Sequence, residues 1–468
     1  MQYSKNKTVI RDFRKEYPSE YMRTVGIIAE YNPFHRGHEY QIQYTKEKLG
    51  ADYVIIAMSG DYVQRGTPAL LAKHARADMA LRCGADLVLE LPVSVCTASA
   101  EAFAMGGVSL LDGLGVVDLL CFGSESGEIS ALKELAEILV EEPEEYKTLL
   151  RNFLSQGLSF PAARSQALTE YFKNPHNFSG DDFDGVLTPL FNEVTRILNT
   201  PNNILGIEYC KALLRLGSSI RPVTVRREGM GYHDTLASNN LSDLRFNPAS
   251  DTDPDSDFPS ASAIRKLICG TDKNGDNYSD LTDYDILASQ IPSDAFDIFK
   301  KVLSSGEFLT EDALNSILSY CLLQKNVSEL ASFLDVSENL AQRIVNQKNL
   351  LQGFLQSASV LKTKELTQTR IQRALLHIIL GIHQVPDKVP YARVLGFRRE
   401  SSSLLKKIKT NSCIPVITKL ADAPSLLDCQ AQELLKETTF ASNLYESLIA
   451  QKNGRKFIHE YEKQIVII

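Results

Sequence analysis

The segment TVGIIAEYNPFHRGH, residues 24 to 38, decides the fold. Its first seven residues are a short apolar run rich in β-branched side chains, which predicts a buried strand. Asn32 and Pro33 end the run, a glycine-containing turn follows, and the polar stretch from Glu39 to Lys48 can form a helix. The order strand, loop, helix is typical of the first unit of an α/β sheet.

The same pattern recurs along the first half of the chain. Further buried strands are predicted at 52–58, 85–91, 117–122 and 221–226, and a helix is predicted at 73–83. Continuous apolar strands that alternate with helices indicate a parallel sheet covered on both faces, which is a Rossmann-like α/β fold. Ligands of such sheets bind beyond the carboxyl ends of the strands.

Helical patterns dominate the rest of the sequence. Residues 128 to 216 are predicted to form a mainly helical insertion, and the Gly-, Asp- and Asn-rich segment 270–277 is the expected linker. The predicted organisation is therefore an N-terminal extension (1–23), an α/β domain (24–275) and a mostly α-helical C-terminal domain (276–468).

The composition indicates the cellular compartment of the protein and the chemical state of its cysteines. The chain has 468 residues, of which 44% are hydrophobic, and no run approaches the roughly 18 apolar residues of a membrane span. Residues 1–24 carry both charges and lack an apolar signal core, so a soluble, cytosolic protein is expected. The eight scattered cysteines form no C-x-x-C pair, which predicts reduced thiols in cores and no thiolate metal site.

The charge distribution is asymmetric. The whole chain carries −8, which argues against indiscriminate coating of nucleic acid, but from residue 360 onward 17 Lys and Arg stand against 10 Asp and Glu. This part therefore carries +7 and the remainder −15. A basic C-terminal third can hold a polyanion, although solvated helix faces would give the same count.

The chemistry of the first segment centres on His35 and His38, which flank Gly37 after the first strand. The glycine lets the backbone approach a ligand, and the following helix offers unpaired N-terminal amides to phosphates. As cations or as neutral donors, the imidazoles can stabilise charge on phosphate oxygens while pyrophosphate leaves ATP. The turn predicts an ATP site without a covalent role for either histidine, and two surface histidines near a turn are the alternative.

A second phosphate-binding helix start is expected at SASAIR, residues 260–265. Ser260 and Ser262 offer small hydroxyl groups, and Arg265 can neutralise the β- and γ-phosphates. Alone this segment predicts a capped helix. Together with the H-x-G-H turn it resembles the paired nucleotide clamp of the HxGH nucleotidyltransferases.

Six segments carry a closer resemblance. In chain order they are GIIAEYNPFHRGH (26–38), MSGDYVQRGTPAL (58–70), GADLVLELP (84–92), FGSE (122–125), PNNILGIEY (201–209) and RREGMGYHD (226–234). With these motifs the chain resembles the bacterial tRNA(Met) cytidine acetate ligase family. The resemblance implies an enzyme that activates acetate with ATP to acetyl-adenylate and then acetylates the wobble cytidine of elongator tRNA(Met).

The family's ATP contacts map onto matching positions. They fall on Gly123, Asn202, Arg227 and a continuous stretch. The stretch comprises Ile28, Ala29, Glu30, Tyr31, Asn32, Pro33, Phe34, His35, Arg36, Gly37, His38, Glu39, Tyr40 and Gln41. Gly123 leaves room for adenine or ribose, Asn202 can read either one, and Arg227 can meet phosphate. Taken alone, these three residues would equally fit a turn, a helix cap and an ion pair.

The acyl-adenylate and the tRNA set further expectations. Because an acyl-adenylate hydrolyses easily, a lid is expected, and the 58–70 segment fits that role, with Asp61 and Arg65 as loop charges that could face solvent. No metal cluster is required, since Mg²⁺ would arrive with ATP. Expected tRNA contacts in the basic tail are Arg393, Arg398, Arg399, Lys406 and Lys407, with Tyr391 and Phe397 nearby for stacking.

Two other functions remain open on sequence grounds. A small-molecule adenylyltransferase would share the H-x-G-H clamp, but the long helical tail and its positive charge count against it. A non-catalytic RNA-binding protein could keep the fold, but the intact His35, Gly37, His38 and Arg265 argue against that reading.

Overall fold

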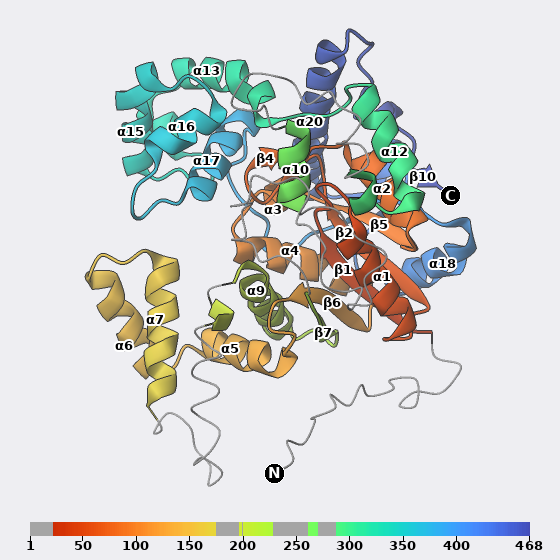
Figure 1. Cartoon of the computed structure of the whole chain (residues 1–468), viewed down its shortest axis with the longest axis horizontal. Coiled ribbons are helices and arrows are strands. Elements are labelled where there is room, and N and C mark those ends of the chain that lie inside the picture. Colours follow the sequence, from red (N-terminus) through yellow and green to blue (C-terminus); the bar gives the residue numbers. More distant parts are fainter. Residues whose placement is uncertain (1–21, 175–195, 199, 228–260, 270–286) are drawn as a thin grey trace.

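The computed structural model describes residues 22–174, 196–198, 200–227, 261–269 and 287–468 (Figure 1). Its largest element is an eight-stranded sheet with the strand order β10-β8-β5-β2-β1-β6-β7, in which β9 also pairs with β8. The five expected strands are confirmed as β1 (Thr24–Ala29), β2 (Tyr53–Ser59), β5 (Leu87–Leu91), β6 (Leu119–Ser124) and β7 (Arg221–Arg226). These five strands are mutually parallel, as their continuous apolar patterns predict.

Three strands of the sheet come from the C-terminal part of the chain. They are β8 (Ala392–Phe397), β9 (Val416–Ile417) and β10 (Val466–Ile467). β8 runs antiparallel to β5, and β9 and β10 run parallel to β8. The sequence predicted a mostly helical body here, so these strands are an addition to that picture. The proposed boundary near residue 275 lies outside the described residues.

Helices cover both faces of the sheet and build a separate lobe. Their bounds are α1 Arg36–Glu47, α2 Lys73–Arg82, α3 Val93–Cys96, α4 Ala100–Gly113, α5 Ile129–Glu141, α6 Glu144–Ser155, α7 Phe160–Lys173, α9 Pro201–Leu216, α10 Ala261–Cys269, α12 Ser293–Ser304, α13 Asn315–Gln324, α14 Val327–Ala331, α15 Glu338–Gln347, α16 Phe354–Leu361, α17 Gln368–Leu380, α18 Ser402–Asn411, α19 Ala423–Leu426 and α20 Cys429–Lys452. None of these described helices is both long and apolar enough to cross a membrane.

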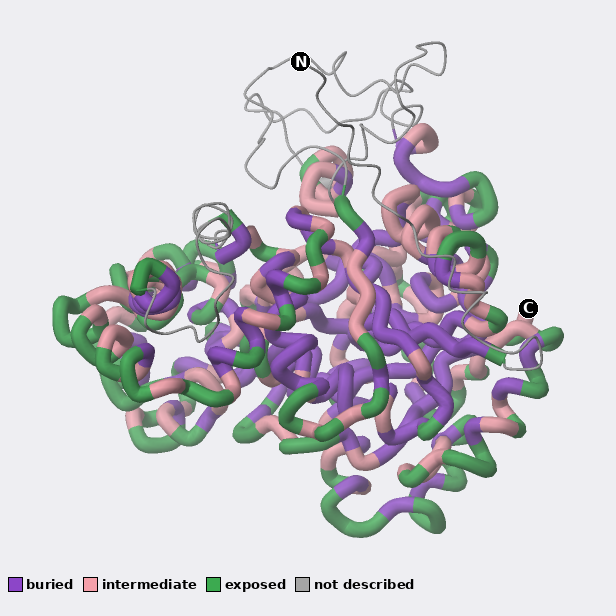
Figure 2. The backbone as a smooth tube through the Cα atoms, turned by 90° about the horizontal axis from the view of Figure 1, so that it is seen from below, coloured by how far each residue is buried: buried purple, intermediate pink, exposed green. Residues whose placement is uncertain are grey.

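The central strands are buried on both sides, as the backbone coloured by burial shows (Figure 2). In β2, Ile55 and Ala57 pack with α4, α5 and α9, whereas Val54, Ile56 and Met58 pack with α1, α2 and α12. A third core joins α13–α17 to α20 and forms the lobe at the upper left of Figure 1. Continuous apolar strands are needed because neither face of the sheet meets water.

The 58–70 segment is a hairpin packed into the structure. Strands β3 (Tyr62–Val63) and β4 (Thr67–Pro68) pair in an antiparallel manner. Gly66 has a φ of +74°, and a side chain there would collide with the backbone of Gln372 and Arg373 in α17. The sequence left open whether Asp61 faces solvent; its carboxylate is buried and accepts a hydrogen bond from the Lys73 amide at 2.8 Å.

Free thiols occupy both buried and exposed positions. Cys83, Cys96, Cys121 and Cys210 are buried free thiols, as predicted. Cys413 and Cys429 are exposed, which corrects the expectation that the cysteines lie in cores.

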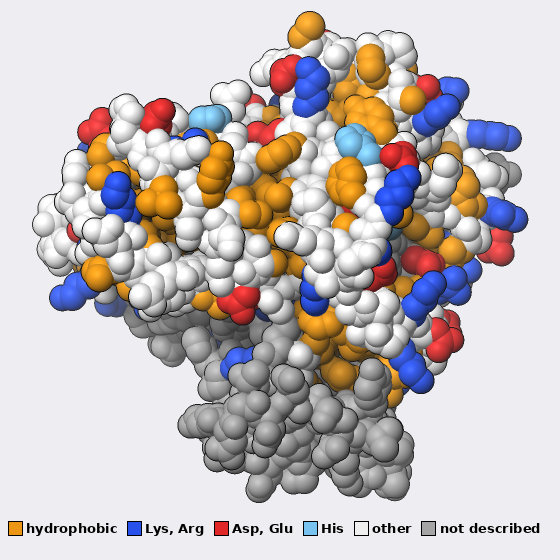
Figure 3. Space-filling view, turned by 90° about the horizontal axis from the view of Figure 1, so that it is seen from above, with side chains coloured by type: hydrophobic (Ala, Val, Ile, Leu, Met, Phe, Trp, Pro, Cys, Tyr) orange, Lys and Arg blue, Asp and Glu red, His pale blue; other side chains and the backbone are white. Residues whose placement is uncertain are grey.

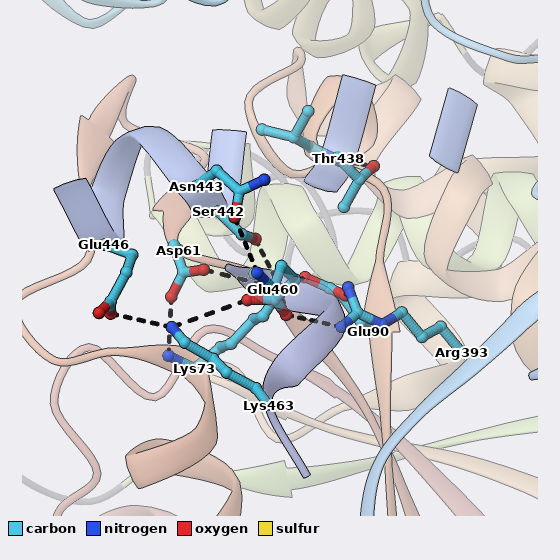
Figure 4. A network of polar contacts seen from close by, with 12 residues as sticks. Asp61, Lys73, Glu90, Arg393, Thr438, Ser442, Asn443, Glu446, Glu460 and Lys463 are labelled. Carbon is cyan, nitrogen blue, oxygen red and sulfur yellow. Dashed lines mark hydrogen bonds and ion pairs between the residues drawn. The ribbon is translucent and has the colours of Figure 1, made fainter. Parts of the chain in front are cut away.

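A network of buried charges joins the two halves of the chain (Figure 4). Lys73 Nζ lies 2.6 Å from Glu90 Oε1 and 2.7 Å from Glu460 Oε1. Arg393 donates to the same two carboxylates, at 2.5 Å to Glu90 and 2.6 Å to Glu460. Burial and Arg393 would lower the pKa of the Lys73 ammonium, but Glu460, Glu90 and Asp61 outweigh them and raise it. The ammonium therefore stays charged in the interior.

Replacing Glu460 by Gln is expected to destabilise the fold strongly. The change leaves Lys73 and Arg393 buried with one carboxylate fewer, and removing one member of such a group costs about 3–5 kcal/mol. Urea unfolding followed by circular dichroism measures this free energy. The exposed Glu462→Gln is the matched control and should change it by less than about 0.5 kcal/mol. Equal effects of both variants would show that the network does not stabilise the fold.

Candidate nucleotide site

The H-x-G-H turn forms the start of α1. His35 is the N-cap residue, and its Nδ1 accepts a hydrogen bond from the Gly37 amide at 3.1 Å. In return, His38 Nδ1 accepts from the His35 amide at 3.3 Å. The two side chains therefore make a reciprocal capping box. The amides of His35 and Gly37 are occupied by this box, which corrects the expectation that they are offered to phosphates.

The capping box fixes the tautomer of both histidines. Because each Nδ1 accepts a backbone N–H, a neutral ring carries its proton on Nε2. The rings stack with their centroids 3.7 Å apart and an interplanar angle of 27°. The pair therefore presents two Nε2–H donors side by side.

Both rings are held neutral. Burial, with the nearby Arg227 and Arg265, lowers the pKa of His35 from 6.5 to about 3. Burial, the His35 ring and Arg227 lower the pKa of His38 well below its usual value. The sequence left the charge of these histidines open, and the geometry assigns them as neutral donors at pH 7.

A cavity of about 290 Å³ opens beside the pair, at the carboxyl ends of β1 and β6. Its lining consists of residues from the turn, the hairpin, and the starts of α4, α9 and α10. The residues are Ile28, Ala29, Glu30, Tyr31, Asn32, His35, His38, Gln41, Gln64, Arg65, Ala100, Phe103, Phe122, Gly123, Pro201, Asn202, Leu205, Tyr209, Arg227, Ala261, Ser262 and Arg265. The structure thus brings together predicted residues from five separate segments of the sequence.

The start of α10 is fastened to the H-x-G-H segment. Arg265 donates to the backbone carbonyl of Asn32, and its second terminal nitrogen lies 3.1 Å from Ser262 Oγ. Asn32 is itself fixed, because its side-chain oxygen accepts from the Leu70 amide at 2.8 Å. The two halves of the expected clamp therefore face one cavity. Ser260 lies outside the described residues.

The far side of the cavity is organised by Glu125. Its carboxylate accepts from the Asn202 side chain at 2.7 Å and from the Asn203 amide at 2.9 Å, so it caps α9. Asn202 Oδ1 in turn accepts from Arg227 at 3.1 Å. A side chain at position 123 would press on Arg227, which explains the glycine there. Glu125 was not among the predicted site residues, although it follows Gly123 and Ser124 within the FGSE motif.

Part of the expected ATP stretch does not line the cavity. Pro33, Phe34, Gly37, Glu39 and Tyr40 are absent from its described wall. Arg36 is also absent and instead donates to the Ser289 carbonyl at 2.6 Å. Conversely, Gln64, Arg65, Phe103, Leu205 and Tyr209 line the cavity without having been predicted. The helix and hairpin positions of these five residues depend on tertiary packing.

The expected tRNA contact at Arg393 is corrected by the structure. Its guanidinium is buried and binds Glu90 and Glu460, so it is not available to a phosphate. Tyr391 is likewise buried and cannot stack on a nucleotide base. Arg393 was expected at the surface because it lies in the positively charged C-terminal part of the sequence.

The other four expected tRNA residues lie at the opposite end of the sheet from the cavity. The Arg398 amide donates to the Asp86 carbonyl, just before β5 begins. Lys407 Nζ lies 3.3 Å from the Met22 carbonyl, just before β1 begins. Arg399 and Lys406 are exposed next to them. The six residues of β1, at about 3.3 Å each, therefore separate these side chains from the H-x-G-H turn by roughly 20 Å.

The fold and site define a class of protein. A Rossmann-like parallel sheet leads from its first strand into a neutral histidine pair, and a second helix start is clamped onto the same turn. This arrangement is that of an HxGH nucleotidyltransferase.

Comparisons with known proteins agree with this class and identify a narrower family within it. The family described as HIGH Nucleotidyl Transferase matches residues 22–460. A tRNA(Met) cytidine acetate ligase of Acetivibrio thermocellus is 37% identical over 96% of this chain and 100% of its own, and one of Clostridium novyi is 38% identical over 85% and 90%. The crystal structure of Thermotoga maritima TmcAL bound with alpha-thio ATP has a TM-score of 0.79 and 30% identity, covering 95% of this chain and 99% of that one. The chain belongs to the HIGH nucleotidyl transferase family and, within it, to the tRNA(Met) cytidine acetate ligases.

The neutral state of the histidine pair can be read by NMR. We expect the imidazoles of His35 and His38 to keep the Nε2–H tautomer from pH 5.5 to 8.5, because burial lowers the pKa of His35 to about 3 and lowers the pKa of His38 well below its usual value. An unperturbed histidine titrates near 6.5 in the same window. Long-range ¹⁵N–¹H spectra report the tautomer, and His35→Asn and His38→Asn assign the signals. A titration of either ring centred near pH 6.5 would contradict the assignment.

Proposed function

We propose that this chain is an ATP-dependent tRNA(Met) cytidine acetate ligase. It forms acetyl-adenylate and then acetylates the wobble cytidine of elongator tRNA(Met) to N⁴-acetylcytidine. The observation that carries the proposal is the neutral imidazole pair, which faces a cavity shared with Arg227 and Arg265. The family membership and the relatives' names supply the substrates.

The first step is an exchange at the α-phosphorus of ATP. A carboxylate oxygen of acetate attacks this phosphorus, a new phosphorus–oxygen bond forms, and the bond to the bridging oxygen of the β-phosphate breaks. Pyrophosphate leaves with the electron pair, and no proton is transferred. The step develops negative charge on phosphate oxygens, so donors already aimed at those oxygens accelerate it.

The chain supplies such donors from three elements. The Nε2–H groups of His35 and His38 come from the start of α1, Arg265 from α10, and Arg227 from the end of β7. The capping box and the Asn202 and Asn32 hydrogen bonds hold these donors in place before the ligand arrives. Preorganisation of this kind avoids reorientation during the reaction.

The second step transfers the acetyl group. The exocyclic amine of cytidine attacks the acetyl carbonyl, the bond between that carbonyl and the AMP oxygen breaks, and the amine loses a proton. AMP is a far better leaving group than oxide, which is why the acid is activated first. The cavity lies among buried side chains such as Phe103 and Tyr209, which limits the access of water to the mixed anhydride.

Mg²⁺ would enter with ATP, held mainly by phosphate oxygens and water. Among the lining residues that the structure describes, Glu30 carries the only carboxylate, and its Oε1 accepts from the Gln64 amide at 2.7 Å. In the described ranges no three His, Cys, Asp or Glu side chains form a metal-binding group. Bound in this way, the ion would neutralise phosphate charge.

Incubation with ATP, labelled acetate and elongator tRNA(Met), followed by nucleoside analysis, should place label in N⁴-acetylcytidine. His35→Ala removes one Nε2–H donor and one acceptor of the capping box, so we expect the rate to fall about 100- to 1000-fold. The matched control is His383→Ala, an exposed histidine stacked on Phe333, which should retain the wild-type rate. Label in a different nucleoside, or an unchanged rate in His35→Ala, would sink the proposal.

Four basic residues lie at the edge of the sheet where β1 and β5 begin. There they contact the tRNA at a distance from the acetylated base. Arg398, Arg399, Lys406 and Lys407 lie on one side of the sheet, with the first two directly after β8 and the others on α18. Figure 3 shows Lys and Arg side chains, with Asp and Glu side chains among them, along the molecular edge farthest from the lobe of α13–α16. A large RNA can reach such an edge while one unpaired base enters the cavity.

Removing charge from this edge should weaken tRNA binding alone. For Arg398→Ala/Arg399→Ala we expect a lower tRNA affinity and a salt dependence that is shallower by about 0.7–0.9 for each lost phosphate contact. ATP affinity should not change. Lys436→Ala on α20 is the control, because this exposed lysine pairs with Glu433 outside the edge. An unchanged salt slope would remove these arginines from the tRNA-binding surface.

A further inference from the structure

We propose that Gln64 and Arg65, at the tip of the β3–β4 hairpin, bind the carboxylate of the acid that is adenylated. Both side chains line the cavity that contains the histidine pair, and the sequence assigned neither of them to a ligand. The inference rests on the proposed function, because it concerns the second substrate of the same reaction. It gives the acid a subsite formed by one short turn.

The tip has a defined backbone conformation. Val63 pairs with Thr67, and the Gly66 amide donates to the Val63 carbonyl at 2.8 Å. The loop therefore contains three residues, with Gly66 at a φ of +74°. Hairpins of this length combine a tight turn with a left-handed third residue, a position that glycine occupies without strain. Gln64 and Arg65 thus project from the middle of a fixed turn.

Three contacts hold the tip against the rest of the site. The Gln64 amide donates to Glu30 Oε1 at 2.7 Å, which ties the tip to the residue that follows β1. The Gly66 backbone touches α17 so closely that a Cβ would not fit. At the base of the hairpin, the Tyr445 hydroxyl donates to the Ala69 carbonyl at 2.9 Å. The hairpin is therefore positioned before any ligand binds.

The strand order places the tip on the side opposite to the nucleoside subsite. The sheet runs β5-β2-β1-β6-β7, and the histidine pair follows the central β1. Gly123, Asn202 and Arg227 belong to β6, to α9 and to the end of β7, on one side of that pair. The hairpin directly follows β2, on the other side. A nucleotide that extends from the histidines toward β6 and β7 leaves its α-phosphorus open to a substrate on the β2 side.

The chemistry of the tip fits a small carboxylate. An arginine guanidinium can donate two parallel hydrogen bonds to the two oxygens of a carboxylate, and a glutamine amide can add a third. Ala100 and Phe103, at the start of α4, give the same cavity an apolar wall for a short alkyl group. The helix α4 contacts both β1 and β2, the strands that the histidine pair and the hairpin follow.

The test compares the affinity for acetate with the affinity for ATP. Acetate-dependent exchange of pyrophosphate into ATP reports the first step without tRNA, and ATP binding is measured separately by calorimetry in the absence of acetate. For Arg65→Ala and Gln64→Ala we expect the KM for acetate to rise about 10- to 100-fold, as expected for lost hydrogen bonds to a charged group. The Kd for ATP should stay within about twofold. Arg65→Lys keeps the positive charge but loses the two parallel N–H donors of the guanidinium. Its affinity for acetate should therefore lie between those of Arg65→Ala and the wild type.

Each result decides between two explanations. The exposed Arg370→Ala on the neighbouring α17 is the matched control and should leave both constants unchanged. A Kd for ATP that rises about tenfold in Arg65→Ala, with an unchanged KM for acetate, would mean that Arg65 contacts phosphate and would overturn the subsite. Wild-type exchange that does not depend on acetate would overturn the proposed function itself, whereas acetate-dependent exchange that is unaltered in both variants would overturn only this inference.

Discussion

The buried ammonium of Lys73 is the constraint on which the rest of the structure depends. A charge removed from water costs several kcal/mol unless opposite charges surround it. Its partners are Asp61 before the hairpin, Glu90 on β5 and Glu460 near the C-terminal strand. The ion is accommodated only when these three segments have come together. The hairpin that lines the nucleotide cavity is therefore positioned partly by a residue some four hundred positions later in the chain.

The central sheet and the core of the site could be predicted from local patterns in the sequence. Four of the five predicted strands, β1, β2, β5 and β6, are largely continuous apolar runs, which a strand buried on both faces requires, whereas the edge strand β7 has the mixed sequence RPVTVR. The H-x-G-H turn could be placed because it follows the first of these runs. Gly123, Asn202, Arg227 and Arg265 meet in one cavity because they lie at the ends of strands or in the first turns of helices at the carboxyl edge of the sheet.

The features that sequence reasoning missed depend on partners far away in the chain. β8 mixes Arg393 with apolar residues, so it resembles a surface segment until Glu90 and Glu460 are placed around the guanidinium. The 58–70 segment looks like a mobile loop because its glycines allow many conformations, yet α17 and α20 pack against it. The capping role of the two histidines was also hidden, since it requires their rings to turn back onto their own backbone.

The antiparallel pairing of β8 with β5 also prevents self-association of the protein through the edge of its sheet. Without β8, the outer side of β5 would present a row of unpaired amide and carbonyl groups on the apolar sequence LVLEL. Such an edge is a template for strand addition by another molecule. Chains that are interrupted before residue 392, whether by stalled synthesis or by proteolysis, would therefore tend to associate through this edge. The catalytic sheet is protected from such association only when the segment from residue 392 onward has been added.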